Sequence, residues 1–139
     1  MKTPQDIIYD YAMTLVTTPY KWGGSNFAGL DCSGLVILLL QAAGVFPYHQ
    51  DASAADLAKT YGAVPFAKDG VKFGTLLFYG DPIFHVTFAL NEYQMVSASG
   101  GDHETVSVED ARLKNAFVKV LALSAHGAPR LMATPKYPW

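Results

Sequence analysis

The sequence predicts an α+β fold with an antiparallel sheet, because helical patterns come first along the chain and strand patterns follow. The 139 residues fit one domain, and half of them are hydrophobic, so a buried core is expected rather than disorder. The longest apolar stretch begins at residue 35 and is far shorter than the about 20 residues that a membrane span needs. We therefore expect a folded domain with no membrane span.

Three helices are predicted in the first half of the chain. The segment 3–6 has the sequence of a capping box with proline in the first turn, and apolar residues at helical spacing continue to Leu15. Asp31 is a suitable N-cap for an apolar, buried helix over 32–43. The segment 53–56 is a second capping box and begins a short helix.

The second half of the chain is rich in β-branched and aromatic residues. Strands are predicted over 75–79, 84–90, 93–97, 105–108 and 117–123, with a weak helix over 109–114. The last segment, 126–139, holds three prolines and is expected on the surface or disordered. The predicted organisation is a single domain over 1–125 followed by this proline-rich tail.

Composition excludes several classes of function. The formal net charge is −2, and no basic run is present, so nucleic-acid binding is not predicted. A single cysteine excludes an intramolecular disulfide framework and a cysteine-based zinc cage. No cofactor is predicted.

Cys32 is the candidate nucleophile. It falls in the first turn of the helix that Asp31 caps, where unpaired N–H groups and the helix dipole favour a thiolate. The segment 20–30 before it is rich in glycine, so the backbone of a substrate could approach closely. Without its context, a lone cysteine would be a small buried hydrophobic residue.

A thiolate hydrolase also needs a base, and the chain has four histidines. His85 lies in a predicted strand among apolar neighbours, which places it at the edge of the core. His49 and His126 are interpreted as surface residues, and His103 lies in a predicted loop. A metal site built from Cys32, His85 and His103 would lack a fourth ligand at any recognisable spacing.

The segment 19–24 is Pro-Tyr-Lys-Trp-Gly-Gly, and the segment 29–36 is Gly-Leu-Asp-Cys-Ser-Gly-Leu-Val. Together these blocks resemble the NlpC/P60 signature of bacterial cell-wall cysteine peptidases. The segment 74–79 resembles the next conserved strand of that family, and His85-Val86 resembles its histidine strand. The resemblance covers about residues 5–123.

The resemblance implies a papain-like core, in which the nucleophile at a helix N-terminus packs on a sheet that carries the base. It implies a peptidoglycan hydrolase that cleaves stem peptides, usually between γ-D-glutamate and a diamino acid. Cys32 would attack the amide carbon, His85 would protonate the leaving amine, and water would hydrolyse the thioester. Another amidase or an acyltransferase on the same core is an open alternative.

The resemblance also assigns roles around the nucleophile. Tyr20 falls where the family has a tyrosine that helps to stabilise the oxyanion. Asp31 and Ser33 would bind the amino end of the peptide, and Trp22 would form a wall of the cleft. The simpler interpretations are a packing aromatic for Tyr20 and Trp22 and a helix cap for Asp31.

The chain departs from the family at the third catalytic position. Twelve residues after the histidine, where the family has His, Asn or Gln, this chain has Ser97. A serine hydroxyl orients an imidazole only weakly and carries no charge. Three interpretations stay open: Ser97 suffices, Asp102 or His103 replaces it, or the enzyme is slow. A catalytically weak or inactive phage structural module is the corresponding alternative function.

The segment 95–101 and the lack of a recognisable signal peptide resemble short versions of the family coded by bacteriophages. The expected partners are therefore a peptidoglycan stem peptide and phage tail proteins. The expected location is synthesis in the cytoplasm. Action on the cell wall would follow delivery by a phage particle, by lysis or by a secretion system.

Overall fold

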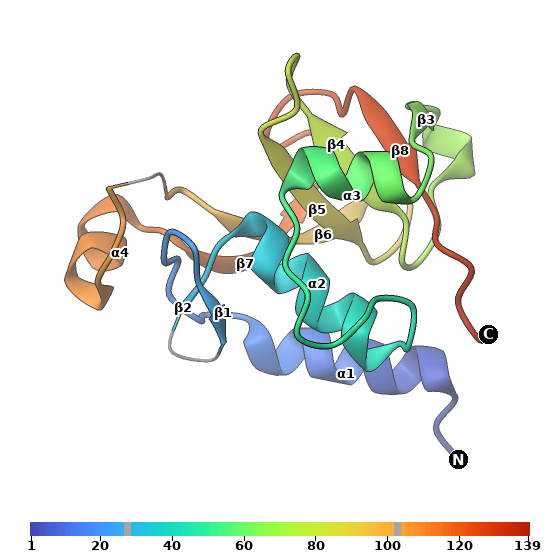
Figure 1. Cartoon of the computed structure of the whole chain (residues 1–139), viewed down its shortest axis with the longest axis horizontal. Helices are drawn as coiled ribbons and strands as arrows, with labels where there is room; N and C mark the ends of the chain where they lie inside the picture. Colours follow the sequence, from blue (N-terminus) through green and yellow to red (C-terminus); the bar gives the residue numbers. More distant parts are fainter. Residues whose placement is uncertain (27–28, 102–103) are drawn as a thin grey trace.

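Helices and an antiparallel sheet form separate layers in the computed structural model, which describes residues 1–26, 29–101 and 104–139 (Figure 1). The helices in these ranges are α1 (Pro4–Leu15), α2 (Cys32–Ala42), α3 (Ala54–Thr60) and α4 (Val108–Lys114), with a 3₁₀ turn at Lys68–Gly70. The strands are β1 (Ser25–Asn26), β2 (Gly29–Leu30), β3 (Val64–Pro65), β4 (Leu76–Tyr79), β5 (His85–Ala89), β6 (Gln94–Ser99), β7 (Phe117–Ala122) and β8 (Leu131–Ala133). The expected α+β class is confirmed.

The three expected helix starts are present with their caps. Thr3 and Asp6 bond reciprocally at the start of α1, and Ser53 and Asp56 do the same at the start of α3. Asp31 caps α2 by accepting the N–H of Gly34. These bonds satisfy backbone donors that a helix N-terminus leaves unpaired, and they fix the residue at which each helix begins.

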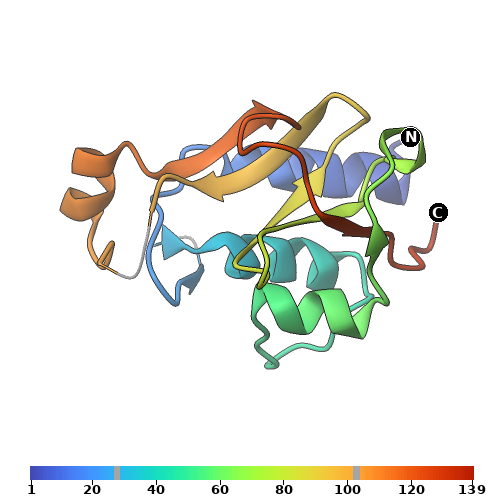
Figure 2. The same cartoon turned by 90° about the horizontal axis from the view of Figure 1, so that it is seen from above.

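Six strands form one sheet in the order β3-β8-β4-β5-β6-β7, and β1 pairs with β2 in a separate small hairpin. Helix α2 packs on β5 and β6, and α1 packs on α2 (Figure 2). The main core lies between this helical layer and the sheet, and a smaller cluster that includes Leu77, Ala89 and Met95 covers the other face. Within the described ranges, no helix is long and apolar enough to cross a membrane.

The C-terminal segment is part of the sheet, so the expectation of a surface or disordered tail after residue 125 is wrong for this segment. Strand β8 pairs with both β3 and β4, with Leu76 opposite Ala133. Beyond it, the Tyr137 ring lies against Phe88 and stacks on Trp139. The prolines suggested a tail, whereas the apolar residues between them pair with β4, a strand more than 50 residues earlier in the chain, and Ala133 is buried.

The strand expected over 105–108 is also wrong. Ser107 caps α4 by accepting the N–H of Asp110, so the chain turns into a helix at this point. Val106 and Val108 are exposed, and their β-branched side chains therefore have no sheet face to cover. The expected helix over 109–114 is confirmed as part of α4.

The Tyr137 hydroxyl gives a test of how firmly the C-terminal segment is attached. It donates a hydrogen bond of 2.6 Å to the carbonyl of Gly74, in the turn that precedes β4. Tyr137→Phe keeps the ring contacts and removes this bond, so we expect the free energy of unfolding to fall by about 1–2 kcal/mol. Urea denaturation measures the change. Tyr93→Phe, at a side chain that is 63% exposed, is the matched control and should change stability very little.

Candidate active site

Cys32 is the first residue of α2, directly behind the Asp31 cap. The backbone N–H groups of Val86 and Ser33 lie near its sulfur and lower the pKa of the thiol, although burial raises this pKa more strongly. The Val86 contact joins the start of α2 to the start of β5. The thiol therefore lies where the helical layer meets the strand that carries the candidate base.

Asp31 fixes the geometry of the loop before the nucleophile. One carboxylate oxygen accepts from the N–H of Gly34 at 2.6 Å and from the Ser33 hydroxyl at 3.3 Å, and the other accepts from the N–H of Gly23 at 3.1 Å. The Asp31 N–H in turn donates to the carbonyl of Gly24. A side chain at Gly34 would collide with that carbonyl and with the Asp31 carboxylate, which explains the glycine two residues after Cys32.

His85 begins β5 and lies opposite Tyr79 in the sheet register. Its Nε2 atom is 3.1 Å from Oγ of Ser97, which is fully buried on β6. The sequence spacing thus identified the group that contacts this ring nitrogen. Because Ser97 occupies the Nε2 side, the other nitrogen, Nδ1, is free to face the cysteine.

The polar contacts continue beyond Ser97 to residues that the sequence analysis missed. The Ser97 hydroxyl is hydrogen-bonded to the Ser99 hydroxyl, and Ser99 is 2.9 Å from Nε2 of His126. The His126 ring also contacts the His85 ring edge to face, with 4.9 Å between centroids. His126 is exposed, as expected of a surface residue, but its contacts with Ser99 and His85 were not foreseen. Nothing in its local sequence shows that the turn after β7 brings it to His85.

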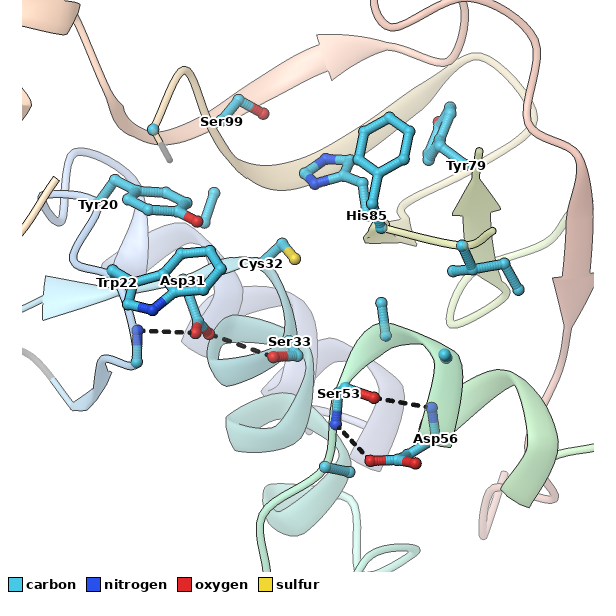
Figure 3. Close-up of a pocket in the computed structure, with 18 of the residues that line it drawn as sticks. Tyr20, Trp22, Asp31, Cys32, Ser33, Ser53, Asp56, Tyr79, His85 and Ser99 are labelled. Atoms are coloured by element: carbon cyan, nitrogen blue, oxygen red, sulfur yellow. Dashed lines mark hydrogen bonds between the residues drawn. The ribbon is translucent and has the colours of Figure 1, made fainter. Parts of the chain in front are cut away.

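These groups surround a pocket of about 950 Å³ between α2, α3 and the sheet (Figure 3). In Figure 3, the Cys32 sulfur and the His85 ring both face this space, and the Tyr20 hydroxyl points toward Cys32. The expected site residues that line the pocket are Tyr20, Trp22, Asp31, Cys32, Ser33 and His85, whereas Ser97 lies behind His85. Asp102 and His103, the expected substitutes for Ser97, lie outside the described residues.

Tyr20 and Trp22 occupy different positions at the pocket. The Tyr20 ring is 5% exposed and lies so close to Gly101 that any side chain there would collide with it. Trp22 is 55% exposed, and its backbone N–H donates to the carbonyl of Thr105 at 2.7 Å. Tyr20 is therefore held in one position by packing, whereas Trp22 lies at the exposed rim of the pocket.

Burial gives the resting pocket a neutral thiol and a neutral imidazole. Burial raises the pKa of the Cys32 thiol above its usual range, and the negative charge of Asp31 raises it further. Burial, and secondly the nearby His126, lowers the pKa of His85 to about 4. The N–H groups near the sulfur lower the pKa of Cys32, in the expected direction, but the burial of the thiol outweighs them.

A cysteine at a helix N-terminus that meets a histidine on an antiparallel sheet defines a papain-like core. The NlpC/P60 family model matches residues 17–122, and the chain belongs to this family. The chain also resembles the solved NlpC/P60 domain of the peptidoglycan hydrolase SagA, with a TM-score of 0.66 and 26% identity, over 94% of this chain and 97% of that one. The expected family and core architecture are confirmed.

Curated relatives match the chain over shorter segments. The γ-D-glutamyl-L-lysine dipeptidyl-peptidase of Bacillus subtilis strain 168 is 40% identical over 77 residues, which are 55% of this chain and 24% of that protein. A probable endopeptidase of Mycobacterium tuberculosis strain H37Rv is 33% identical over 88 residues, 63% of this chain and 22% of that protein. The chain spans less than a quarter of the length of either relative.

The low pKa of His85 predicts a loss of stability in acid. An unfolded chain takes up this proton near pH 6.5, whereas the folded chain takes it up only near pH 4. The free energy of unfolding should therefore fall by up to about 3 kcal/mol as the pH decreases between these values. Urea denaturation of wild type and His85→Gln at several pH values measures the free energy of unfolding of each. The two curves should converge in acid, and parallel curves would contradict the burial argument.

The charge of Asp31 can be separated from its capping role. Asp31→Asn keeps an oxygen that accepts from Gly34 and removes the charge that raises the Cys32 pKa. We expect the pH midpoint of iodoacetamide alkylation at Cys32 to move to lower pH. Asp31→Ala also removes the cap, and it should cost about 0.5–2 kcal/mol in the free energy of unfolding. An unchanged midpoint in Asp31→Asn would show that burial alone sets the thiol pKa.

Proposed function

We propose that this chain is a peptidoglycan hydrolase, a cysteine endopeptidase that cleaves amide bonds in stem peptides. The observation that carries the proposal is the pairing of Cys32 and His85 across one pocket, with Ser97 on the far nitrogen of the imidazole. This is the arrangement of a nucleophile, its base and an orienting acceptor. The named activities of the family relatives support the same class of reaction.

The reaction begins with the neutral pair that burial favours. His85 Nδ1 takes the proton of the Cys32 thiol as the sulfur attacks the amide carbon, and the carbonyl oxygen becomes an oxyanion. The C–N bond then breaks, and the His85 imidazolium gives its proton to the leaving amine. This leaves a thioester on Cys32. A water molecule, deprotonated by His85, attacks the thioester and releases the acid and the free thiol.

The oxyanion needs hydrogen-bond donors beside the sulfur. The N–H groups of Cys32 and Ser33 already face Sγ, and the Tyr20 hydroxyl points toward Cys32 (Figure 3). We assign the Cys32 N–H and the Tyr20 hydroxyl to this role. Such donors each lower the barrier by about 3–4 kcal/mol when they are fixed in advance, and the tight packing of Tyr20 on Gly101 supplies that fixation.

The substrate proposed is a γ-D-glutamyl-diamino acid stem peptide. The exposed rim at Trp22 and the acidic group at Asp31 suit an extended peptide with a free amino end, which Asp31 and Ser33 would bind. The name of the Bacillus subtilis relative, which specifies a γ-D-glutamyl-L-lysine bond, supports this bond type. We further propose that a phage particle, cell lysis or a secretion system delivers the protein to the wall.

Digestion of purified peptidoglycan tests the function directly. We expect wild type to release stem-peptide fragments, whose masses identify the bond, and we expect Cys32→Ala to reduce release by at least about 10³-fold. His49→Ala, at an exposed loop residue outside this pocket, is the control and should retain activity.

The absence of cleavage would point to a different class of protein. If wild type releases nothing from several wall chemotypes while thermal unfolding shows that it is folded, the chain is not a peptidase. The alternative, a catalytically weak or inactive structural module of a phage, would then replace it. Release of fragments cut at another amide bond would instead favour an amidase on the same core.

A further inference from the structure

We propose that His126 is a positioning residue for His85, acting through the buried hydroxyls of Ser97 and Ser99. The inference rests on the proposed function, since it concerns how the base of that reaction is oriented. Its basis is a continuous set of contacts: His85 Nε2 to Ser97 at 3.1 Å, Ser97 to Ser99, and Ser99 to His126 Nε2 at 2.9 Å. We call these four side chains the relay.

The fold holds each member of the relay in place. Ser97 and Ser99 are two residues apart on β6, so both side chains point to the same face of the sheet. Both are almost fully buried, which leaves their hydroxyls dependent on each other and on the two histidines. His126 sits in a tight turn after β7, in which the N–H of Gly127 donates to the carbonyl of Ser124 at 3.0 Å.

Two ring contacts hold the His85 and His126 rings next to each other. The Tyr79 ring lies against both imidazoles, with centroid separations of 5.6 Å to His85 and 5.8 Å to His126. The Tyr79 hydroxyl is itself fixed by Met95 and by the carbonyl of Leu123. Tyr79 is therefore a rigid support on which the His85 and His126 rings pack edge to face.

The hydrogen bonds of the relay can run in one of two directions, and the direction decides which nitrogen of His85 carries the proton. We assign Nε2 of neutral His126 as an acceptor: the Ser99 hydroxyl donates to it, Ser97 donates to Ser99, and Nε2–H of His85 donates to Ser97. His85 Nδ1 is then unprotonated and faces the thiol as a base. The contacts by themselves allow either direction, because hydroxyls and neutral imidazoles can both donate and accept, and the tautomer measurement below distinguishes the two.

Protonation of His126 reverses every bond in the relay. His126 Nε2–H would donate to Ser99, Ser99 to Ser97, and Ser97 to Nε2 of His85, which puts the His85 proton on Nδ1 and removes the base. The groups that face His126 are His85 on β5, Tyr79 on β4 and the Lys119 ammonium on β7. Burial and the Lys119 charge lower the pKa of His126, which keeps the relay in its productive direction to lower pH.

The tautomer of His85 is the direct readout, measured by long-range ¹H–¹⁵N NMR of the imidazole nitrogens at pH 7.5. We expect a proton on Nε2 in wild type and a mixture of tautomers in His126→Phe, which keeps an aromatic ring but has no acceptor. His126→Gln supplies an amide oxygen that accepts from Ser99, so it should restore the Nε2 tautomer. His49→Phe is the control, and thermal unfolding confirms that each variant is folded.

Kinetics with a synthetic γ-D-glutamyl-L-lysine peptide give the second readout. We expect kcat to fall about tenfold in His126→Phe and to recover in His126→Gln, since one net hydrogen bond is at stake. The acid limb of the kcat profile that follows His126 should vanish in His126→Gln. An unchanged His85 tautomer in His126→Phe would overturn the inference, even if the altered pocket wall reduced the rate.

The two proposals fail in different ways. If wild type releases nothing from several wall chemotypes while His126→Phe changes the His85 tautomer, the proposed function fails and the relay stands. If wild type cleaves the peptide, and His126→Phe retains both full kcat and the Nε2 tautomer, the function stands and the relay is overturned.

Discussion

The carboxylate of Asp31 is the interaction on which the site depends. It accepts from Gly23 in the loop, from Ser33 and from Gly34 in the first turn of α2, so it fixes the loop and the helix start as one unit. Cys32 lies between these anchors, and its position follows from them. The same carboxylate puts a negative charge beside the thiol and raises its pKa. The group that places the candidate nucleophile therefore adds to the effect of burial, which is the larger cause of the raised pKa of Cys32.

The neutral state of the Cys32 thiol determines what the rest of the pocket must supply. A buried neutral thiol needs a base that is also neutral at rest, and burial of His85 supplies one, with a pKa of about 4. In the proposed reaction, proton transfer would accompany attack rather than precede it, because burial disfavours the charged forms of both groups before a substrate arrives. The tautomer of His85 becomes decisive under these conditions, since a neutral imidazole is a base at only one of its two nitrogens.

Local sequence signals predicted the parts of the fold that local physics determines. The caps at Thr3, Asp31 and Ser53 each identified a helix start, because a cap bonds within three residues. Family spacing also placed Ser97 beside His85. The strand β8 and the contacts of His126 were missed because both depend on partners far away in the chain. Proline content near the C-terminus gave no sign that Leu76 would pair with Ala133.

The position of β8 explains why the missed residue was a histidine of the C-terminal segment. After β7 the chain must return across the sheet to insert β8 beside β4, and the turn that begins this return contains His126. The crossing passes the face on which Ser97 and Ser99 present their hydroxyls. The segment that inserts β8 thereby also brings His126 to the end of the buried polar row that Ser97 and Ser99 form. In the proposed relay, the connection from β7 to β8 both completes the sheet and orients the base.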